Sequence, residues 1–514
     1  MQRDRKRRQR RRRRRRQRQI HAQNKLISSL GKRKGSPCQQ DGDGDSRAGK
    51  IMRSLIPNPQ LPEDILFCIH SLLPMREAAR AAHLSHAFLS SWRRYPNLIF
   101  NKDTIGLKKN LYGENFHHKI GRILRNHSGI GLKTLKLDYS GMCGFDGTSY
   151  LDSWLQAALK PGIEELTLWL TETIRKYNFP CSLLSGGVGN SLQNLKLRFI
   201  ALHPTAELGP LRSLTSLHLC HVSSTWDELK CLLSNSLALE QLELVNCVEI
   251  TCLKIPCALQ RLSSLSVLAC LDLDVIESKA PNLSSLFISG HSLNFSRVET
   301  LQMKKLDFSR SNFIRYARAK LPSLMPNLET LVIDSGCEVV DAPMLPTKFL
   351  YLKHLTIRLL LGPTSRSYDY FSLVSFFDAS PSLETFVLDV TQLYMVHESI
   401  RLDSQLRHIP EHCHACLKNV KITGFSSAKS LIELACYILK NAVFLECLTL
   451  DTIYGFRCNE GNKYKSCLPM SHGVLMEVPR TLSAIRTYIE NKVPSTVKLT
   501  VLEPCSRWHD KGRW

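Results

Sequence analysis

Two histidines and two cysteines fall within five positions late in the chain, and both residue types are ligands that zinc prefers. The run His412-Cys413-His414-Ala415-Cys416 holds a Cys-x-x-Cys pair with adjacent imidazoles. No second pair stands at the spacing of a zinc finger, and a strand-like segment follows the run directly. We therefore expect no metal site here and no cofactor elsewhere in the chain.

Motifs for catalysis are also incomplete. The run Gly186-Gly187-Val188-Gly189 has neither a strand before it nor a Lys-Ser or Lys-Thr after it, so it does not fit a phosphate-binding loop. Serine, histidine and aspartate are frequent, but no spacing fixes a catalytic triad. We expect no catalytic residues and no enzymatic activity of the chain's own.

Positive charge is concentrated at the N-terminus. Residues 1–50 hold 19 Lys or Arg and 4 Asp, a net charge of +15, which leaves +9 of the total +24 for the other 464 residues. Like-charge repulsion predicts a disordered basic arm and linker over 1–54. The arm contains six consecutive arginines and no aromatic residue, which excludes base stacking by the arm. The arm can be interpreted as a nuclear import signal, as a solvated tail or as a nucleic-acid contact. The import signal would favour the nucleus over the cytoplasm.

The 18 cysteines follow no framework spacing, and no apolar run is long enough for a membrane span. With no apolar signal-peptide core either, we expect reduced thiols in an intracellular protein and no membrane partner.

A repeat of the form Leu-x-x-Leu-x-Leu, with other apolar residues allowed in the leucine positions, dominates the middle of the chain. Its intervals of 20 to 34 residues are typical of leucine-rich repeats with insertions. The thirteen units begin at Leu132, Ile163, Leu192, Leu214, Leu239, Leu262, Leu283, Met303, Leu328, Leu352, Leu383, Leu417 and Leu445.

Alternation within each unit points the last two leucines into a shared core, because successive side chains of a strand face opposite ways. One unit cannot bury this face alone, but a stack can. The fold class is therefore α/β, with a solenoid over 132–416 and a parallel sheet on its concave side. The Asn or Cys that usually follows the strand appears only as Cys247 and Cys270, which predicts an irregular solenoid.

Residues between and just after the last two leucines are expected on the concave face, where Thr167, Asp334, Asp389 and Asp451 also fall. Aromatic and arginine side chains among mixed charges suit a protein-binding surface. The predicted target-binding residues are Lys136, Trp169, Lys196, Arg198, His218, Glu243, Phe287 and Arg358.

Before the repeats, the segment from Leu61 to Leu98 predicts three short helices. Glu63 and Asp64 suit the first turn of one helix, Pro74 ends it and opens the next, and Ser85 is placed to cap the third. About forty residues are too few to bury a core alone, so this module needs the rest of the chain or a partner.

This segment resembles an F-box, from its Leu-Pro opening through LLPMREAARAAHLS to SSWRR, and the PNLIF that follows is similar to plant F-box/leucine-rich-repeat proteins. The resemblance implies a three-helix F-box-like module over 55–99 that docks on a Skp-type adaptor and through it on a cullin. The run His83-Leu84-Ser85-His86 departs from the usual Val-Ser-Arg. The adaptor contacts implied by position are Leu61, Pro62, Ile65, Leu66, Ile69, Leu73, Pro74, Ala82, Leu84 and Trp92.

From Leu417 the chain resembles the FBD region found at the end of many plant F-box proteins. We expect final repeats and a cap over 417–505, a tail over 506–514, and a helical bridge over 100–131. The helix predicted within this region places one face inward, formed by Leu431, Leu434, Ala435, Ile438 and Leu439.

Together these features predict a substrate-recruiting F-box subunit of a Skp-cullin-F-box ubiquitin ligase that holds an unknown protein target. Two alternatives stay open. One is a leucine-rich-repeat scaffold with no link to ubiquitin, and the other is a nuclear RNA-associated protein that acts through its basic arm.

Overall fold

The computed structural model describes residues 62–106, 114–140, 148–172, 177–290, 294–298, 302–338, 341–360, 367–391, 397, 399–400, 405–409, 411–454 and 472–504. The described residues from Glu63 onward belong to one compact unit. The predicted arm and linker, the adaptor contact Leu61 and the tail at 506–514 lie outside the described residues.

The three predicted helices of the F-box-like module are present as α2 (Glu63–Leu72), α3 (Met75–Ala81) and α4 (His86–Trp92). Pro74 stands at the N-cap of α3, where its missing N–H costs nothing. The hydroxyl of Ser85 accepts a hydrogen bond of 3.2 Å from the Phe88 N–H at the start of α4.

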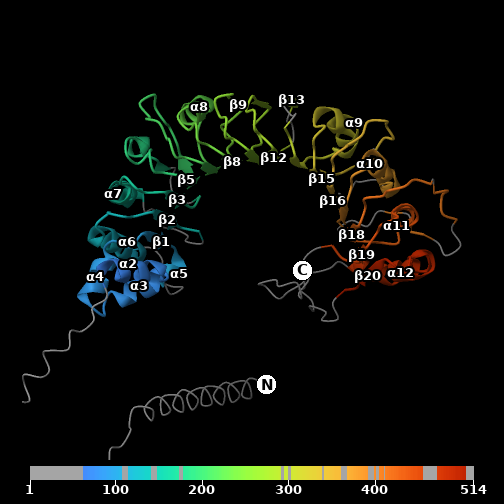
Figure 1. Cartoon of the computed structure of the whole chain (residues 1–514), viewed down its shortest axis with the longest axis horizontal. Helices are drawn as coiled ribbons and strands as arrows, with labels where there is room; N and C mark the ends of the chain where they lie inside the picture. Colours follow the sequence, from blue (N-terminus) through green and yellow to red (C-terminus); the bar gives the residue numbers. More distant parts are fainter. Residues whose placement is uncertain are drawn as a thin grey trace, which may run out of the picture. The chain divides into compact units, whose positions relative to one another are not determined.

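A single parallel sheet of fifteen strands runs through the rest of the unit, in the order β1-β2-β3-β5-β7-β8-β10-β12-β14-β15-β16-β17-β18-β19-β20 (Figure 1). Each of the thirteen predicted units supplies one strand, so the predicted α/β fold with an irregular solenoid is confirmed. These strands are β2 (Thr134–Asp138), β3 (Glu165–Trp169), β5 (Asn194–Arg198), β7 (Ser216–Cys220), β8 (Gln241–Val245), β10 (Ser264–Leu268), β12 (Ser285–Ser289), β14 (Lys305–Ser309), β15 (Thr330–Gly336), β16 (His354–Leu360), β17 (Thr385–Val390), β18 (Asn419–Thr423) and β19 (Cys447–Asp451).

The buried leucine positions explain why these segments form strands and why neighbouring strands pair in register. In β5, Leu195 and Leu197 are fully buried, and so is Leu192 in the turn before the strand. The polar positions of β5 lie on the opposite face, and the same alternation recurs along the sheet. Each unit thus pairs with the next leucine to leucine, as Leu195 does with Leu217.

The sheet begins one strand earlier than the repeat pattern predicts. β1 (Asn97–Phe100) pairs in parallel with β2, and Leu98 and Phe100 are buried in the same core. Met75 and Ala78 of α3 also join this core. The predicted helical bridge holds α5 (Lys102–Ile105) and α6 (Glu114–Asn126).

The units differ in what connects their strands. Figure 1 shows the connecting helices on one side of the main sheet, which leaves the other face of the sheet open. These helices are α7 (Thr148–Ala158), α8 (Trp226–Ser234), α9 (Ile314–Leu324) and α10 (Val374–Ala379). Other units use short strands, in a sheet of β9 (Cys252–Ile255), β11 (Val275–Ser278) and β13 (Asn294–Val298) and a pair of β4 (Tyr177–Asn178) and β6 (Ile200–Ala201).

At the C-terminal end, α11 (Lys429–Asn441) and α12 (His472–Tyr488) precede the last strand, β20 (Lys498–Leu502), which pairs with β19. Burial on α11 extends beyond the single inward face predicted from the sequence. Glu433 and Cys436 are also buried, because the Glu433 carboxylate lies 2.6 Å from Arg407 Nε and the Cys436 thiol lies 3.4 Å from the carbonyl of Tyr488 in α12.

Candidate functional site

Helix α2 presents its apolar stripe to solvent rather than to the core. Large apolar side chains are usually buried, so a group of exposed ones on a single module indicates an interaction surface. We call this group the docking surface. Its members, with their exposed fractions, are Ile65 (44%), Ile69 (41%), Leu72 (85%) and Leu84 (77%).

The inward side of α2 carries a histidine instead. His70 is fully buried, and its Nε2 lies 2.7 Å from the Ala78 carbonyl oxygen. The rings of Phe88, Trp92 and Tyr95 surround the imidazole at centroid distances of 5.5, 6.3 and 6.0 Å. The helix is therefore held to its neighbours by His70 together with the half-buried Leu66 and Leu73, while Ile65, Ile69 and Leu72 remain exposed.

The predicted adaptor contacts divide by burial. Leu66, Leu73 and Trp92 are half-buried and Ala82 is buried. Ala82 can therefore support an adaptor contact only indirectly, through the residues that it packs against. Leu72, which is the most exposed of the stripe, is missing from the predicted contacts. The exposed contacts are Pro62, Ile65, Ile69, Pro74 and Leu84.

On the open face of the main sheet, register places the third and fifth residues of successive strands in two rows. Lys136, Thr167, Lys196, His218 and Glu243 are consecutive neighbours in the third-position row. The row continues to Phe287, which is half-buried. Thr167 is buried, contrary to its predicted exposure, and so is Asp451 farther along the sheet.

A basic and aromatic cluster occupies the first strands of this face. The Lys136 ammonium lies 4.8 Å from the centroid of the Trp169 ring and 3.7 Å from the Asp138 carboxylate. A cation over an indole face is attracted by the ring quadrupole. Trp169 pairs in register with Arg198 on the next strand.

Arg198 extends the cluster beyond the strand end. Its guanidinium carbon lies 5.1 Å from the centroid of the Phe199 ring, which stacks on His221 at 4.4 Å. His221 Nε2 in turn lies 3.3 Å from Asn246 Nδ2. Phe199 and His221 were missed by sequence reasoning, because both adopt positive φ (55° and 51°) without the glycine that usually signals this conformation.

This cluster also holds polar atoms without satisfied partners. The indole N–H of Trp169 and the Nε–H of Arg198 are buried with no hydrogen-bond acceptor among the described atoms. Unsatisfied buried donors cost stability, so they are rare in residues placed only for folding. The unsatisfied donors of Trp169 and Arg198 therefore favour a binding role for the cluster.

A second cluster on the open face is mainly acidic. Arg358 lies between two carboxylates, 3.2 Å from Asp334 and 3.6 Å from Asp389. Burial and the Asp334 charge raise the pKa of Asp307, while Arg358 opposes the shift. His218 and Glu243, 2.6 Å apart, lie between the two clusters in the strand order.

The His-Cys run at 412–416 does not form a metal centre with its surroundings. His414 Nε2 lies 2.8 Å from the Tyr437 hydroxyl, and Cys413 and Cys416 are exposed. Among the described residues no group of three or more His, Cys, Asp or Glu is placed to hold a metal ion. None of the described helices has the length and apolar character needed to cross a membrane.

Comparisons with known proteins agree with this architecture. A family model described as the At1g61320/AtMIF1 LRR domain matches residues 123–506, which is 384 of the 514 residues. The fold and this match define a leucine-rich-repeat protein, and the chain belongs to the At1g61320/AtMIF1 leucine-rich-repeat family.

Relatives from Arabidopsis thaliana add the F-box and FBD regions. An F-box/FBD/LRR-repeat protein (At5g56810) is 28% identical over 432 residues, covering 81% of this chain and 94% of the relative. An FBD-associated F-box protein (At5g53635) is 25% identical over 423 residues, covering 76% and 94%. An internalin of Listeria monocytogenes aligns over 68% of this chain and 94% of its own at 13% identity, with a TM-score of 0.30. The predicted resemblance to plant F-box/leucine-rich-repeat proteins with an FBD-like region is thereby confirmed.

Proposed function

We propose that the chain is a substrate-recruiting subunit of a Skp-cullin-F-box ubiquitin ligase. The docking surface would bind a Skp-type adaptor, and the open face of the main sheet would hold a protein target. Catalysis would belong to the partners, and this chain would contribute proximity and orientation.

The observation that carries the proposal is the orientation of α2. Ile65, Ile69 and Leu72 face solvent while His70 of the same helix fills the inner side. A module used only as a cap of the repeats would place its aliphatic side chains inward, because their burial stabilises the fold by about 25 cal/mol per Å². The names of the Arabidopsis relatives support an F-box role for the chain.

For the target, the basic and aromatic cluster is the best candidate contact. Trp169 and Arg198 are residue types that dominate binding energy at protein interfaces. Lys136 and Lys196 add positive charge beside them, so we propose a target segment that combines apolar and acidic side chains.

Co-precipitation tests the adaptor contact. Tagged wild-type protein should recover a Skp-type adaptor and a cullin, and the Ile65→Ser/Ile69→Ser variant should recover neither. The matched control is Leu237→Ser/Leu271→Ser, which removes two leucines that are each 55% exposed and lie in the repeats. If the α2 variant recovers the adaptor at the wild-type level, the docking surface does not bind the adaptor.

We also propose that residues 1–50 direct the chain to the nucleus, on the basis of their net charge of +15. Replacing the arginines at 11–16 by glutamine should move a fluorescent fusion to the cytoplasm, whereas replacing them by lysine, which keeps the charge, should not. Nuclear fluorescence that survives the glutamine replacement would remove this assignment.

A further inference from the structure

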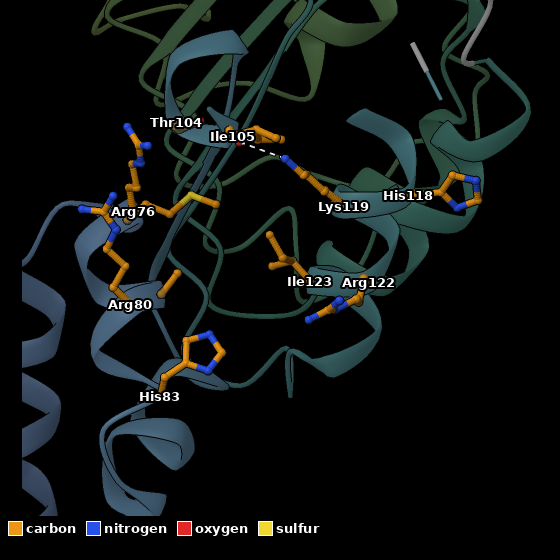
Figure 2. Close-up of a pocket in the computed structure, with 11 residues that line it drawn as sticks. Arg76, Arg80, His83, Thr104, Ile105, His118, Lys119, Arg122 and Ile123 are labelled. Carbon is orange, nitrogen blue, oxygen red and sulfur yellow. Dashed lines mark hydrogen bonds between the residues drawn. The ribbon is translucent and has the colours of Figure 1, made fainter. Parts of the chain in front are cut away.

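A groove lined by basic side chains lies between the F-box-like module and α6, the second helix of the bridge, apart from both the docking surface and the open face. Its volume is about 610 Å³, within the range of small-molecule sites. Helix α3 forms one side and α6 the other (Figure 2). Met75, Ile105 and Ile123 supply its apolar lining.

The described residues of the lining carry positive charge, and none of them is a carboxylate. Arg76, Arg80 and His83 come from the first side, and Lys119 and Arg122 come from α6. Figure 2 shows Lys119 and Arg122 directed from α6 toward α3, with His83 facing them from the end of α3. Because the described lining supplies cations from both sides of the groove, an anion between the two helices is favoured.

Existing interactions neutralise only part of this charge. Arg80 pairs with Glu77 at 2.8 Å. The Lys119 ammonium donates to the Ile105 carbonyl at 3.3 Å, where it complements the C-terminal end of α5 but keeps its charge. Among the described residues, Arg76 and Arg122 have no ion-pair partner within 4.0 Å.

The geometry assigns the groove to a compact ligand that carries several phosphate groups. A single phosphate offers charge to the cations of one helix, whereas a ligand with two or three linked phosphates offers it to both α3, which carries Arg76, and α6, which carries Arg122. Guanidinium groups favour this chemistry because they form paired, charge-assisted hydrogen bonds to phosphate oxygens. A groove of this volume suits a small ligand better than an extended polymer.

Calorimetric titration of the full chain with inorganic tripolyphosphate and with orthophosphate tests the assignment. Above the unselective background binding of the basic arm, tripolyphosphate should bind at one saturable site, and orthophosphate should bind much more weakly. Arg76→Gln/Arg122→Gln should weaken the tripolyphosphate site by about ten-fold or more, because it removes one charged donor from each side.

The charge-matched control is Arg212→Gln/Arg315→Gln, which removes two exposed arginines elsewhere in the repeats. The basic arm binds polyanions without selectivity, but its contribution is the same in every variant. Equal tripolyphosphate affinity in the groove variant and the wild type, or an equal loss in the control, would overturn the assignment. Competition by a glutamate-rich peptide as strong as that by tripolyphosphate would also overturn it, in favour of an acidic protein segment.

Discussion

Asp307 is a residue of the open face whose negative charge destabilises the fold. It stands on β14 in the acidic cluster, where burial and the neighbouring Asp334 raise the pKa of its carboxyl group. A carboxyl group whose pKa is higher in the folded than in the unfolded chain destabilises the fold at neutral pH. That cost is complete above the folded pKa and disappears as the pH falls to the ordinary value.

We therefore expect Asp307→Asn to increase the free energy of unfolding at pH 7, with the gain shrinking as the pH falls through the raised pKa. Urea denaturation across this pH range measures the effect. Asp389→Asn is the control with the opposite sign, because it removes a carboxylate that lies 3.6 Å from Arg358. A loss of stability in Asp307→Asn at pH 7 would contradict the account of this cluster.

Among the elements, helix α9 is connected to two later segments of the chain by hydrogen bonds from Arg318. Its side chain is 1% exposed, and it donates to the carbonyl oxygens of Leu345, Thr347 and Ser375 at 2.6, 3.1 and 2.8 Å. Burial lowers the pKa of Arg318, while the Asp378 charge opposes the shift. The helix is thus fixed by charge-assisted hydrogen bonds as well as by apolar packing.

Arg318→Met should destabilise the protein by about 2–4 kcal/mol, because the three carbonyl oxygens lose their donor. A shift of the urea midpoint measures this loss. Arg315→Met, on an exposed position of the same helix, should change stability by no more than about 0.5 kcal/mol. Equal midpoints for the two variants would show that the buried hydrogen bonds are not stabilising.

Glu477 plays a comparable part in attaching α12. Its Oε1 accepts from the Ser427 N–H at 3.0 Å and lies 3.2 Å from His397 Nε2. Burial acts to raise the pKa of Glu477, but the hydrogen bonds from His397 and Ser427 outweigh it, so the pKa is lowered. A lowered pKa stabilises the fold above the ordinary value, and this contribution is lost as the pH falls through the folded pKa.

Glu477→Gln should accordingly loosen α12 at pH 7 by about 1–3 kcal/mol, the range for a lost hydrogen bond to a charged group. Hydrogen exchange of the α12 amides is the readout. The difference from wild type should close below the folded pKa of Glu477, and a difference that is constant with pH would contradict the role of its charge.

The elements that follow one periodic rule could be predicted from the sequence. Thirteen strands were predicted because alternating leucines define both the strand and its buried face. β1 was not predicted as a strand, since Asn97–Phe100 lacks the leading leucine of the repeat. The short strands of the three-stranded sheet were missed for the same reason, because they carry no repeat signature.

The candidate sites were less predictable because they depend on residues that break such rules. His70 interrupts an apolar stripe, and only its burial shows which side of α2 faces inward. Phe199 and His221 take a left-handed conformation that their residue types do not signal. The groove joins arginines that stand 46 positions apart in the sequence, at Arg76 and Arg122.

At the scale of the whole molecule, the chain separates its surfaces by chemistry. The docking surface is aliphatic, the groove is basic, and the open face carries a basic and aromatic cluster followed by an acidic one. The first fifty residues hold +15 of the net charge of +24. Association through the docking surface should therefore depend little on salt, whereas binding through the groove or the arm should weaken steeply as salt rises.

Titration of a purified Skp-type adaptor into the full chain tests directly whether the docking surface binds the adaptor. We expect saturable binding by the wild type and by Leu237→Ser/Leu271→Ser, with affinity reduced at least about ten-fold in Ile65→Ser/Ile69→Ser. Circular dichroism should show the same fold for all three proteins. Equal affinity for the adaptor in all three, or no affinity in the folded wild type, would contradict the assignment of the chain as an F-box subunit.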